Sequence, residues 1–344
     1  RRAAVVADAE GLAPVEASNR FEGRVDTIRL PASWVRAFKP GTIKYWARAG
    51  QPGVELFGFA RLAANPEQEV MFEQWHANDP AVLRQRIIMH VLHRDGMVPS
   101  MIDYFHTRST YLLLESAGTR RLDDLLKESR QNWRSSSEPM VPLAKALPVM
   151  IDLLRSVEVM ERLNMVHGAL TERSVALLEG DIHALLPDLR RACMIDSQMS
   201  EVSQLTLQGA PHHKLTYRFA PEMQDGVPTG PSNNIWQLGL IFAKMLFDAE
   251  VPGGDLDSST AEGRAEIEAA IRYNFEIRAT PGFRYLSAEY DDLRVLVASM
   301  LDKDSERRLD ASGALRLASQ AAFSRGIAIG PRRSPNPVVD ETFH

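Results

Sequence analysis

Between residues 219 and 239 the sequence reads FAPEMQDGVPTGPSNNIWQLG, a loop followed by the start of a strongly apolar segment. The first part is rich in proline, glycine and polar residues, which is typical of a loop. The apolar segment, Leu238–Phe247, carries one charge, Lys244. It is shorter than the roughly 20 residues that a membrane span requires. The stretch therefore predicts a buried helix, Asn234–Phe247, and no membrane span.

Before residue 116 the patterns are those of β-strands. Short runs of apolar and aromatic residues bounded by turn residues predict strands at Val25–Leu30, Thr42–Ala49, Val54–Leu62, Glu69–Trp75, Met101–His106 and Thr110–Leu114. Gly50–Gly53 predicts a hairpin turn, and Ala81–His93 is the one helix expected in this half. Residues 1–18 show no clear period, so we expect a loosely ordered lead-in.

After residue 115 the patterns become helical. Apolar residues at helical spacing predict helices at Leu122–Ser129, Val141–Leu163, Asn234–Phe247, Ala261–Tyr273, Tyr290–Leu301 and Ala311–Ser324. Two short strands are expected at Val175–Leu178 and Ala184–Leu186. The proline-rich residues 328–344 predict a disordered tail. A β-rich half followed by a helical half predicts the α+β class.

Composition and charge limit the classes of partner. The 344 residues carry a net charge of −5 with a pI near 6.0, so no overall attraction to nucleic acid or anionic lipid is expected. Cys193 is the only cysteine, which excludes an intrachain disulfide and a cysteine-based zinc cluster. Composition therefore gives no sign of a nucleic-acid or membrane partner. We predict no cofactor and no metal.

Four short motifs follow one another in the order and spacing found in one family. They are Met165–Leu170 (MVHGAL), Phe219–Glu222 (FAPE), Asn234–Gly239 (NIWQLG) and Asp304–Arg308 (DSERR). Together they resemble the motifs of eukaryotic protein kinases, over roughly residues 41–327. The resemblance implies a bilobal fold with a small β-rich lobe at residues 41–115 and a large helical lobe at residues 116–327. Residues 1–40 would then form an N-terminal extension.

Two details resemble a narrower group. His167-Gly168, where most kinases have His-Arg, and the string Trp236–Gly239 are similar to the secreted rhoptry-type kinases and pseudokinases of coccidian parasites. Members of that group carry an extension ahead of the small lobe. The resemblance implies secretion by a parasite into its vacuole, its cyst or the host cell.

The kinase resemblance places altered residues at the positions that hold phosphate. Active kinases need a lysine on the third strand and a glutamate on the following helix. Here these positions hold Glu73 and Arg84. The two residues either form the same ion pair with its charges exchanged, or Arg84 is exposed on a solvated helix face. A glutamate in place of the lysine would repel polyphosphate. Lys44 is the one candidate for a relocated lysine.

The catalytic loop is altered as well. Ala169 stands where the resemblance puts the Asp base, and a methyl group cannot accept a proton. Ser174 replaces the magnesium-binding Asn. Asp188 keeps the position of the magnesium-binding Asp, where it either binds a cation or caps a local turn. Gly168 replaces the arginine that would bind a phosphorylated activation loop.

The residues that organise the large lobe are present. Glu222 and Arg308 are expected to form a buried, bidentate ion pair. Asn234 replaces the usual Asp of the central helix, and it can still accept backbone hydrogen bonds. Trp236 is expected in the core. We therefore expect structural roles for Glu222, Arg308, Asn234 and Trp236.

These residues predict a catalytically inactive pseudokinase that binds a protein partner as a scaffold or allosteric partner and does not bind ATP. Two alternatives stay open. One is a pseudokinase that binds nucleotide without transferring phosphate. The other is an atypical active Ser/Thr kinase that uses Lys44, Asp188 and a displaced base.

Overall fold

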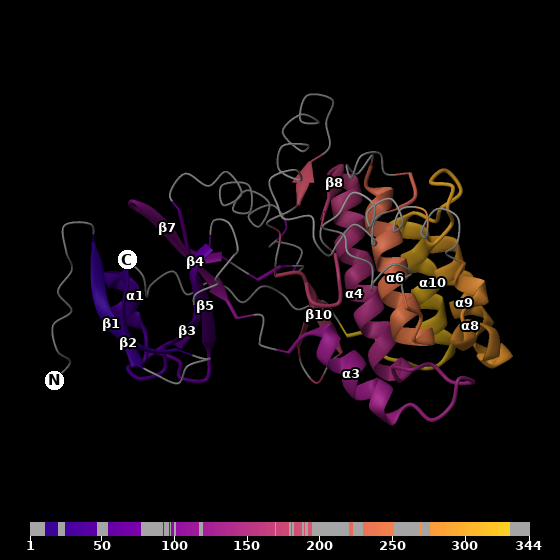
Figure 1. Cartoon of the computed structure of the whole chain (residues 1–344), viewed down its shortest axis with the longest axis horizontal. Coiled ribbons are helices and arrows are strands. Elements are labelled where there is room, and N and C mark those ends of the chain that lie inside the picture. Colours follow the sequence, from indigo (N-terminus) through magenta and orange to yellow (C-terminus); the bar gives the residue numbers. More distant parts are fainter. Residues whose placement is uncertain are drawn as a thin grey trace. The chain divides into compact units, whose positions relative to one another are not determined.

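The structure is a computed structural model. It describes residues 11–19, 25–46, 54–76, 92, 96, 98–99, 101–116, 120–168, 170–178, 180, 182–187, 189, 192–194, 220–222, 230–250, 269 and 276–330. These residues form two compact units, one built from residues 11–116 and one from residues 120–330 (Figure 1). The first unit is a mixed sheet with a short helix, and the second is mainly helical, so the fold is α+β.

The first unit is built on a seven-stranded sheet, counted over the described residues. Its strands are β1 (Leu12–Asn19), β2 (Val25–Pro31), β3 (Lys44–Trp46), β4 (Val54–Arg61), β5 (Glu69–His76), β6 (Met101–His106) and β7 (Ser109–Glu115). They lie in the order β2-β1-β3-β4-β5-β7-β6. Neighbouring strands are antiparallel, except that β1 and β3 pair in parallel over two residues each.

The expectation of a loosely ordered lead-in over residues 1–18 is wrong for the part that the structure describes. Residues 12–19 form β1, which pairs with β2 from Leu12↔Pro31 to Ser18↔Val25. The sequence of β1 is LAPVEASN, and alanine, proline, glutamate and asparagine all have low strand propensity. The strand therefore forms through its pairing with β2 and not through a local preference.

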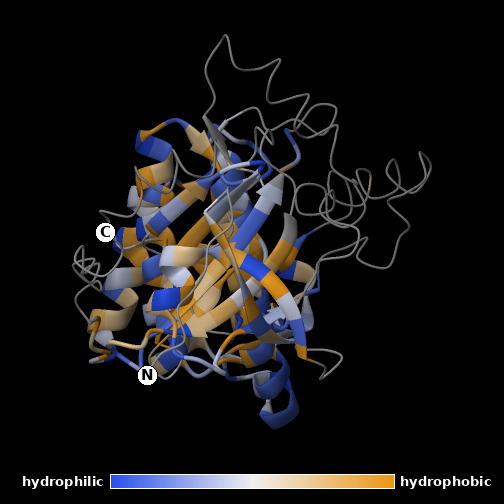
Figure 2. Ribbon diagram, turned by 90° about the vertical axis from the view of Figure 1, so that its left-hand side faces the viewer, coloured by the Kyte–Doolittle hydropathy of each residue, from blue (hydrophilic) through white to orange (hydrophobic). Residues whose placement is uncertain are grey.

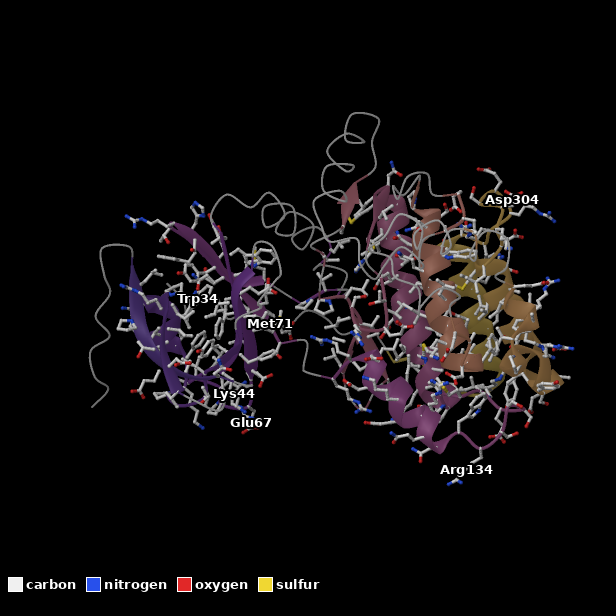
Figure 3. All side chains as sticks on the ribbon, in the orientation of Figure 1. Trp34, Lys44, Glu67, Met71, Arg134 and Asp304 are labelled. Atoms are coloured by element: carbon white, nitrogen blue, oxygen red, sulfur yellow. The ribbon has the colours of Figure 1, made fainter. Side chains whose placement is uncertain are left out.

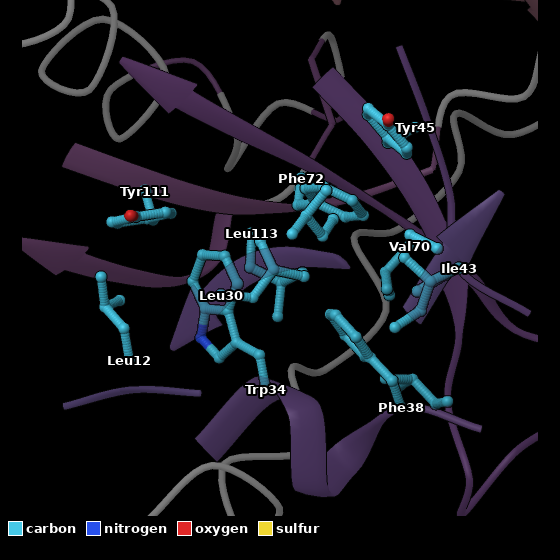
Figure 4. Close-up of a cluster of buried hydrophobic side chains, with 14 residues drawn as sticks. Leu12, Leu30, Trp34, Phe38, Ile43, Tyr45, Val70, Phe72, Tyr111 and Leu113 are labelled. Atoms are coloured by element: carbon cyan, nitrogen blue, oxygen red, sulfur yellow. The ribbon is translucent and has the colours of Figure 1, made fainter. Parts of the chain in front are cut away.

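A short helix that the sequence did not predict, α1 (Ala32–Ala37), follows β2 directly. Trp34 of this helix and Phe38, the residue that follows the helix, are buried in a cluster with the inner side chains of the sheet (Figure 4). Trp34 meets the Tyr111 ring edge-on at 6.3 Å between ring centroids, and Phe38 stacks on Phe72 at 6.2 Å. The indole Nε1 of Trp34 donates to Asp103 Oδ2 over 2.7 Å. Side chains of β1, β2 and α1 are thus part of the core of this unit.

The second unit is organised around α6 (Ser232–Phe247). Every residue from Asn233 to Phe247 except Lys244 is buried, as expected of a helix that is apolar on all sides. Around it lie α3 (Leu122–Asn132), α4 (Leu143–Arg162), α8 (Pro281–Tyr285), α9 (Asp291–Met300), α10 (Ala311–Ser324) and the 3-10 turns Ile277–Ala279 and Ala288–Tyr290. Gly239 permits close packing, because a Cβ there would lie 2.9 Å from the Leu301 side chain.

Four short strands complete the second unit within the described residues. They are β8 (Met165–Val166), β9 (Ala176–Leu178), β10 (His183–Leu185) and β11 (Cys193–Met194). β9 pairs with β10 and β8 pairs with β11, both antiparallel. Helix α10 packs on α4, while α9 contacts both α6 and α10. Along helices and strands alike, hydrophobic and hydrophilic residues alternate in bands (Figure 2).

Most predicted elements in the described residues are present with small shifts at their ends. The predicted helix Ala311–Ser324 coincides with α10, and Val141–Leu163 becomes α4, two residues shorter at its start and one at its end. The predicted helices Ala81–His93 and Ala261–Tyr273 lie almost entirely outside the described residues, as do residues 331–344 of the expected tail. None of the described helices combines the length and apolarity needed to cross a bilayer.

Replacing Trp34 by alanine is expected to destabilise the chain by about 3–5 kcal/mol, because a fully buried indole is lost and a cavity remains. The measurement is urea-induced unfolding of the full chain. Thr27→Ala, at an exposed position of β2, is the control and should change stability by less than about 0.5 kcal/mol. A Trp34→Ala variant as stable as the unmodified chain would contradict the packing of α1.

Candidate functional site

The start of α6 holds a loop through the side chain of Asn234. This residue is fully buried. Its Oδ1 accepts the backbone N–H of His167 at 2.9 Å, and its Nδ2 donates to the backbone oxygen of Met165 at 2.9 Å. A carboxylate could accept the first bond but could not donate the second. Asn234 therefore uses both ends of its amide to fix the loop that follows β8.

Two more carboxamides of α6 hold neighbouring backbone segments. Gln237 Oε1 accepts the N–H of Leu170 at 3.4 Å, and Asn233 Oδ1 accepts the N–H of Ala220 at 3.0 Å. Both side chains are 1% exposed. Sequence reasoning missed these two residues. The available signal was a group of uncharged polar residues at positions i, i+1 and i+4 at the start of an apolar helix.

Ser174, at the position that the resemblance assigns to a magnesium ligand, is engaged within its own loop. Its hydroxyl donates to the Thr171 backbone oxygen at 2.8 Å and accepts the Thr171 N–H at 2.9 Å. The Ser174 N–H donates to Thr171 Oγ1 at 3.3 Å. These reciprocal bonds close the turn from residue 171 to residue 174 and occupy the hydroxyl.

Glu222 and Arg308 form the expected bidentate ion pair. Arg308 Nη1 lies 2.5 Å from Glu222 Oε1, and Nη2 lies 2.8 Å from Oε2. The Arg308 side chain is 0% exposed and that of Glu222 is 19% exposed. Arg308 also donates to the backbone oxygens of Asp302 and Ser232, at 3.0 and 3.2 Å. Its guanidinium carbon lies 5.2 Å from the centre of the buried Trp236 ring.

In the first unit, Glu73 stands on β5 and is 6% exposed. Its Oε2 accepts the indole N–H of Trp75 at 2.9 Å. Val70 and Phe72 of the same strand belong to the cluster beneath α1, so Glu73 points to the opposite face. Its cross-strand neighbours there, Phe57 and Leu112, are buried and apolar. A carboxyl group with buried apolar residues in register on both neighbouring strands is therefore part of this face of the sheet.

Lys44 does not occupy the position that Glu73 holds. Lys44 is in register with Phe59 of β4, which is in register with Met71 of β5, two residues before Glu73. Two strand spacings and two residues of rise separate their Cα atoms by about 12 Å. The Lys44 side chain is exposed at the margin of the unit, whereas Trp34 lies inside it (Figure 3).

The other predicted site residues, Arg84, Ala169 and Asp188, lie outside the described residues, as does the predicted turn Gly50–Gly53. The alternatives for Arg84 and Asp188 therefore stay open. In the part of the chain that the structure describes, no group of three or more His, Cys, Asp or Glu side chains is arranged to hold a metal ion.

Replacing Arg308 by methionine is expected to cost about 3–5 kcal/mol of stability, because it leaves the Glu222 carboxylate without its counter-charge. The free energy of unfolding from urea titration is the measurement. The exposed neighbour Arg307, replaced in the same way, is the matched control. The double variant with Glu222→Gln should recover part of the loss. Equal stability of Arg308→Met and Arg307→Met would show that the pair contributes little.

Replacing Asn234 by aspartate should destabilise the chain at pH 7 by about 1–3 kcal/mol. The new carboxylate keeps the bond from His167 but places a second acceptor against the Met165 oxygen. Asn65→Asp at an exposed position controls for the added charge. Thermal unfolding of both variants gives the comparison. An Asn234→Asp variant that melts with the unmodified chain would mean that the donor half of the amide is dispensable.

No protein-family model matches the chain, and no curated protein matches it. The resemblance to protein kinases therefore rests on the four short motifs and on the residues that occupy them.

Proposed function

We propose that the chain is a catalytically inactive pseudokinase with a bilobal protein kinase fold, and that it acts by binding a protein partner as a scaffold or allosteric partner. The observation that carries this proposal is the buried carboxylate of Glu73. It stands on the third strand counted from β3, where a kinase holds the lysine that binds the α- and β-phosphates. Its hydrogen bond from Trp75 holds the carboxylate in place.

A carboxyl group at this position offers the phosphates of a nucleotide no cation to bind. Where the carboxyl is ionised it adds repulsion, because two unit charges about 4 Å apart interact by about 4 kcal/mol at the dielectric typical of a protein surface. Ser174 adds to the argument, because its hydroxyl is bonded to the backbone of Thr171. The proposed loss of chemistry thus rests on two positions, each occupied by a side chain with another role.

The proposed role as a scaffold is supported by the structural residues that match the kinase motifs. The Glu222–Arg308 pair and the Asn234 contacts hold the loops that a kinase uses for substrate and catalysis. Such contacts cost a chain desolvation and ordering, and they fix a surface even where no phosphate is transferred. A partner that recognises this surface would need about 800 Å² on each side for a stable complex.

The two alternatives differ from the proposal in their use of nucleotide. An atypical kinase built on Lys44 would have to place its ammonium at the position of Glu73 from a Cα atom about 12 Å away, two strands across the sheet. A nucleotide-binding pseudokinase would need a phosphate site away from Glu73. Both alternatives require that Mg-ATP binds the folded chain.

The proposal predicts that millimolar Mg-ATP leaves the unfolding temperature of the full chain unchanged. A ligand at 100 times its dissociation constant adds about 2.7 kcal/mol of stability, which thermal unfolding detects. Magnesium tripolyphosphate is the control for unspecific binding of polyphosphate. An upward shift of several degrees with Mg-ATP but not with tripolyphosphate would overturn the proposal. Loss of that shift in Lys44→Met would then assign the binding to Lys44.

A further inference from the structure

The C-terminal end of α4 meets the N-terminus of α10, and three carboxylates gather at this joint. Asp310 caps α10, with its Oδ1 accepting the Gly313 N–H at 2.7 Å. From α4, Glu161 Oε2 accepts the Ala311 N–H at 3.0 Å, and Glu158 Oε1 accepts the Ser312 hydroxyl at 2.7 Å. Helices α4 and α10 are in contact within the second unit.

Among the residues that the structure describes, the positive charges nearest in the sequence form no ion pair with Glu161. Arg162, the next residue of α4, is exposed. Arg316 is the only charged residue within α10, and it is also exposed. Arg308, which precedes α10, is bound to Glu222. The charged groups that act on Glu161 are the carboxylates of Asp310 and Glu158, so its own negative charge is unfavourable there.

The titration of Glu161 agrees with this geometry. Burial raises the pKa of the Glu161 carboxyl from 4.5 to about 7, and the charges of Asp310 and Glu158 act in the same direction. The hydrogen bond from Ala311 opposes the rise, because a backbone N–H at a helix N-terminus favours a carboxylate. The effect of burial is larger than that of this hydrogen bond, and the nearby carboxylate of Asp310 adds to the rise of the pKa.

We propose that the joint between α4 and α10 is pH-sensitive, and that deprotonation of Glu161 near neutral pH loosens the docking of α10 on α4. A protonated Glu161 still accepts the Ala311 N–H through its carbonyl oxygen and adds no charge to the cluster. A deprotonated Glu161 places a further carboxylate beside Asp310 and Glu158, and among the described residues no cation is paired with it. This inference is independent of the proposed function.

The direction of the effect follows from the two pKa values. Between about pH 4.5 and pH 7, the folded state keeps a proton that the unfolded state has lost. The stability that this proton provides is therefore complete at low pH and is lost as the pH rises toward 7. Between the two pKa values, each pH unit changes the equilibrium constant of unfolding by roughly tenfold. Above pH 7 both states have lost the proton, so the contribution of Glu161 to the free energy of unfolding stays constant.

Hydrogen exchange of the full chain tests the joint directly. We expect the protection of amides 311–324, corrected for the intrinsic exchange rate, to fall by about tenfold or more between pH 5.5 and pH 8. Glu161→Gln keeps the acceptor for Ala311 and cannot be deprotonated, so its protection should not change with pH. Glu306→Gln, which removes an exposed carboxylate of the preceding loop, should behave like the unmodified chain.

A carboxyl ¹³C titration of the unmodified chain, with Glu161 assigned through backbone correlations, gives a measurement that needs no variant. A midpoint near pH 7 supports the proposal, and a midpoint below about pH 5.5 overturns it. Protection of residues 311–324 that is equal at pH 5.5 and pH 8 overturns it as well. The proposal is also overturned if the Glu161→Gln variant loses protection between pH 5.5 and pH 8 as the unmodified chain does.

Discussion

Arg308 is a guanidinium with no exposure to solvent, and such a charge requires both a counter-charge and acceptors for its N–H groups. Glu222 provides the carboxylate, while backbone oxygens of Asp302 and Ser232 accept further bonds. The partners come from segments 86 and 76 residues away in the sequence. The pair therefore fixes segment 220–222, the first residue of α6 and the loop before α10 in a single arrangement.

The first turn of α6, once fixed, positions a set of neutral hydrogen-bonding groups. Asn233, Asn234 and Gln237 are buried, and each binds a backbone group of a segment that has little regular structure of its own. Neutral amides do this without burying a net charge, which would need another counter-ion. The Glu222–Arg308 pair and the three amides thus have different roles. The pair sets the position of the helix, and the amides fix the backbone of Met165, His167, Leu170 and Ala220 relative to it.

How far the sequence predicts this structure depends on how local the determinants are. Helix α10 was predicted at its observed ends, because its apolar spacing and its Asp310 cap are local signals. β1 was missed, because its residues have low strand propensity and the strand depends on β2. α1 was missed because its six residues are too few to show a helical spacing, although it directly follows Pro31 and proline is common at the start of a helix.

In the candidate site, too, some contacts were predictable from the sequence and others were not. The Glu222–Arg308 pair was predicted from motif positions, and its geometry agrees. The local bonds of Ser174 and the indole bond of Glu73 were not predictable, because they depend on side-chain directions that only the folded backbone sets. Asn233 and Gln237 were overlooked because polar residues at a helix start usually face water.

The position of Trp34 determines the order in which the first unit can form. Its indole bonds to Asp103, 69 residues later, and packs on Tyr111 of β7. A chain emerging from the ribosome therefore presents α1, with its large aromatic side chains, well before the strands that cover it have been made. Contacts of such long sequence separation close slowly, and the waiting apolar surface is open to aggregation or to a chaperone. β1 and β2 can pair as soon as both have been made, but the cluster around Trp34 is complete only when β6 and β7 have followed.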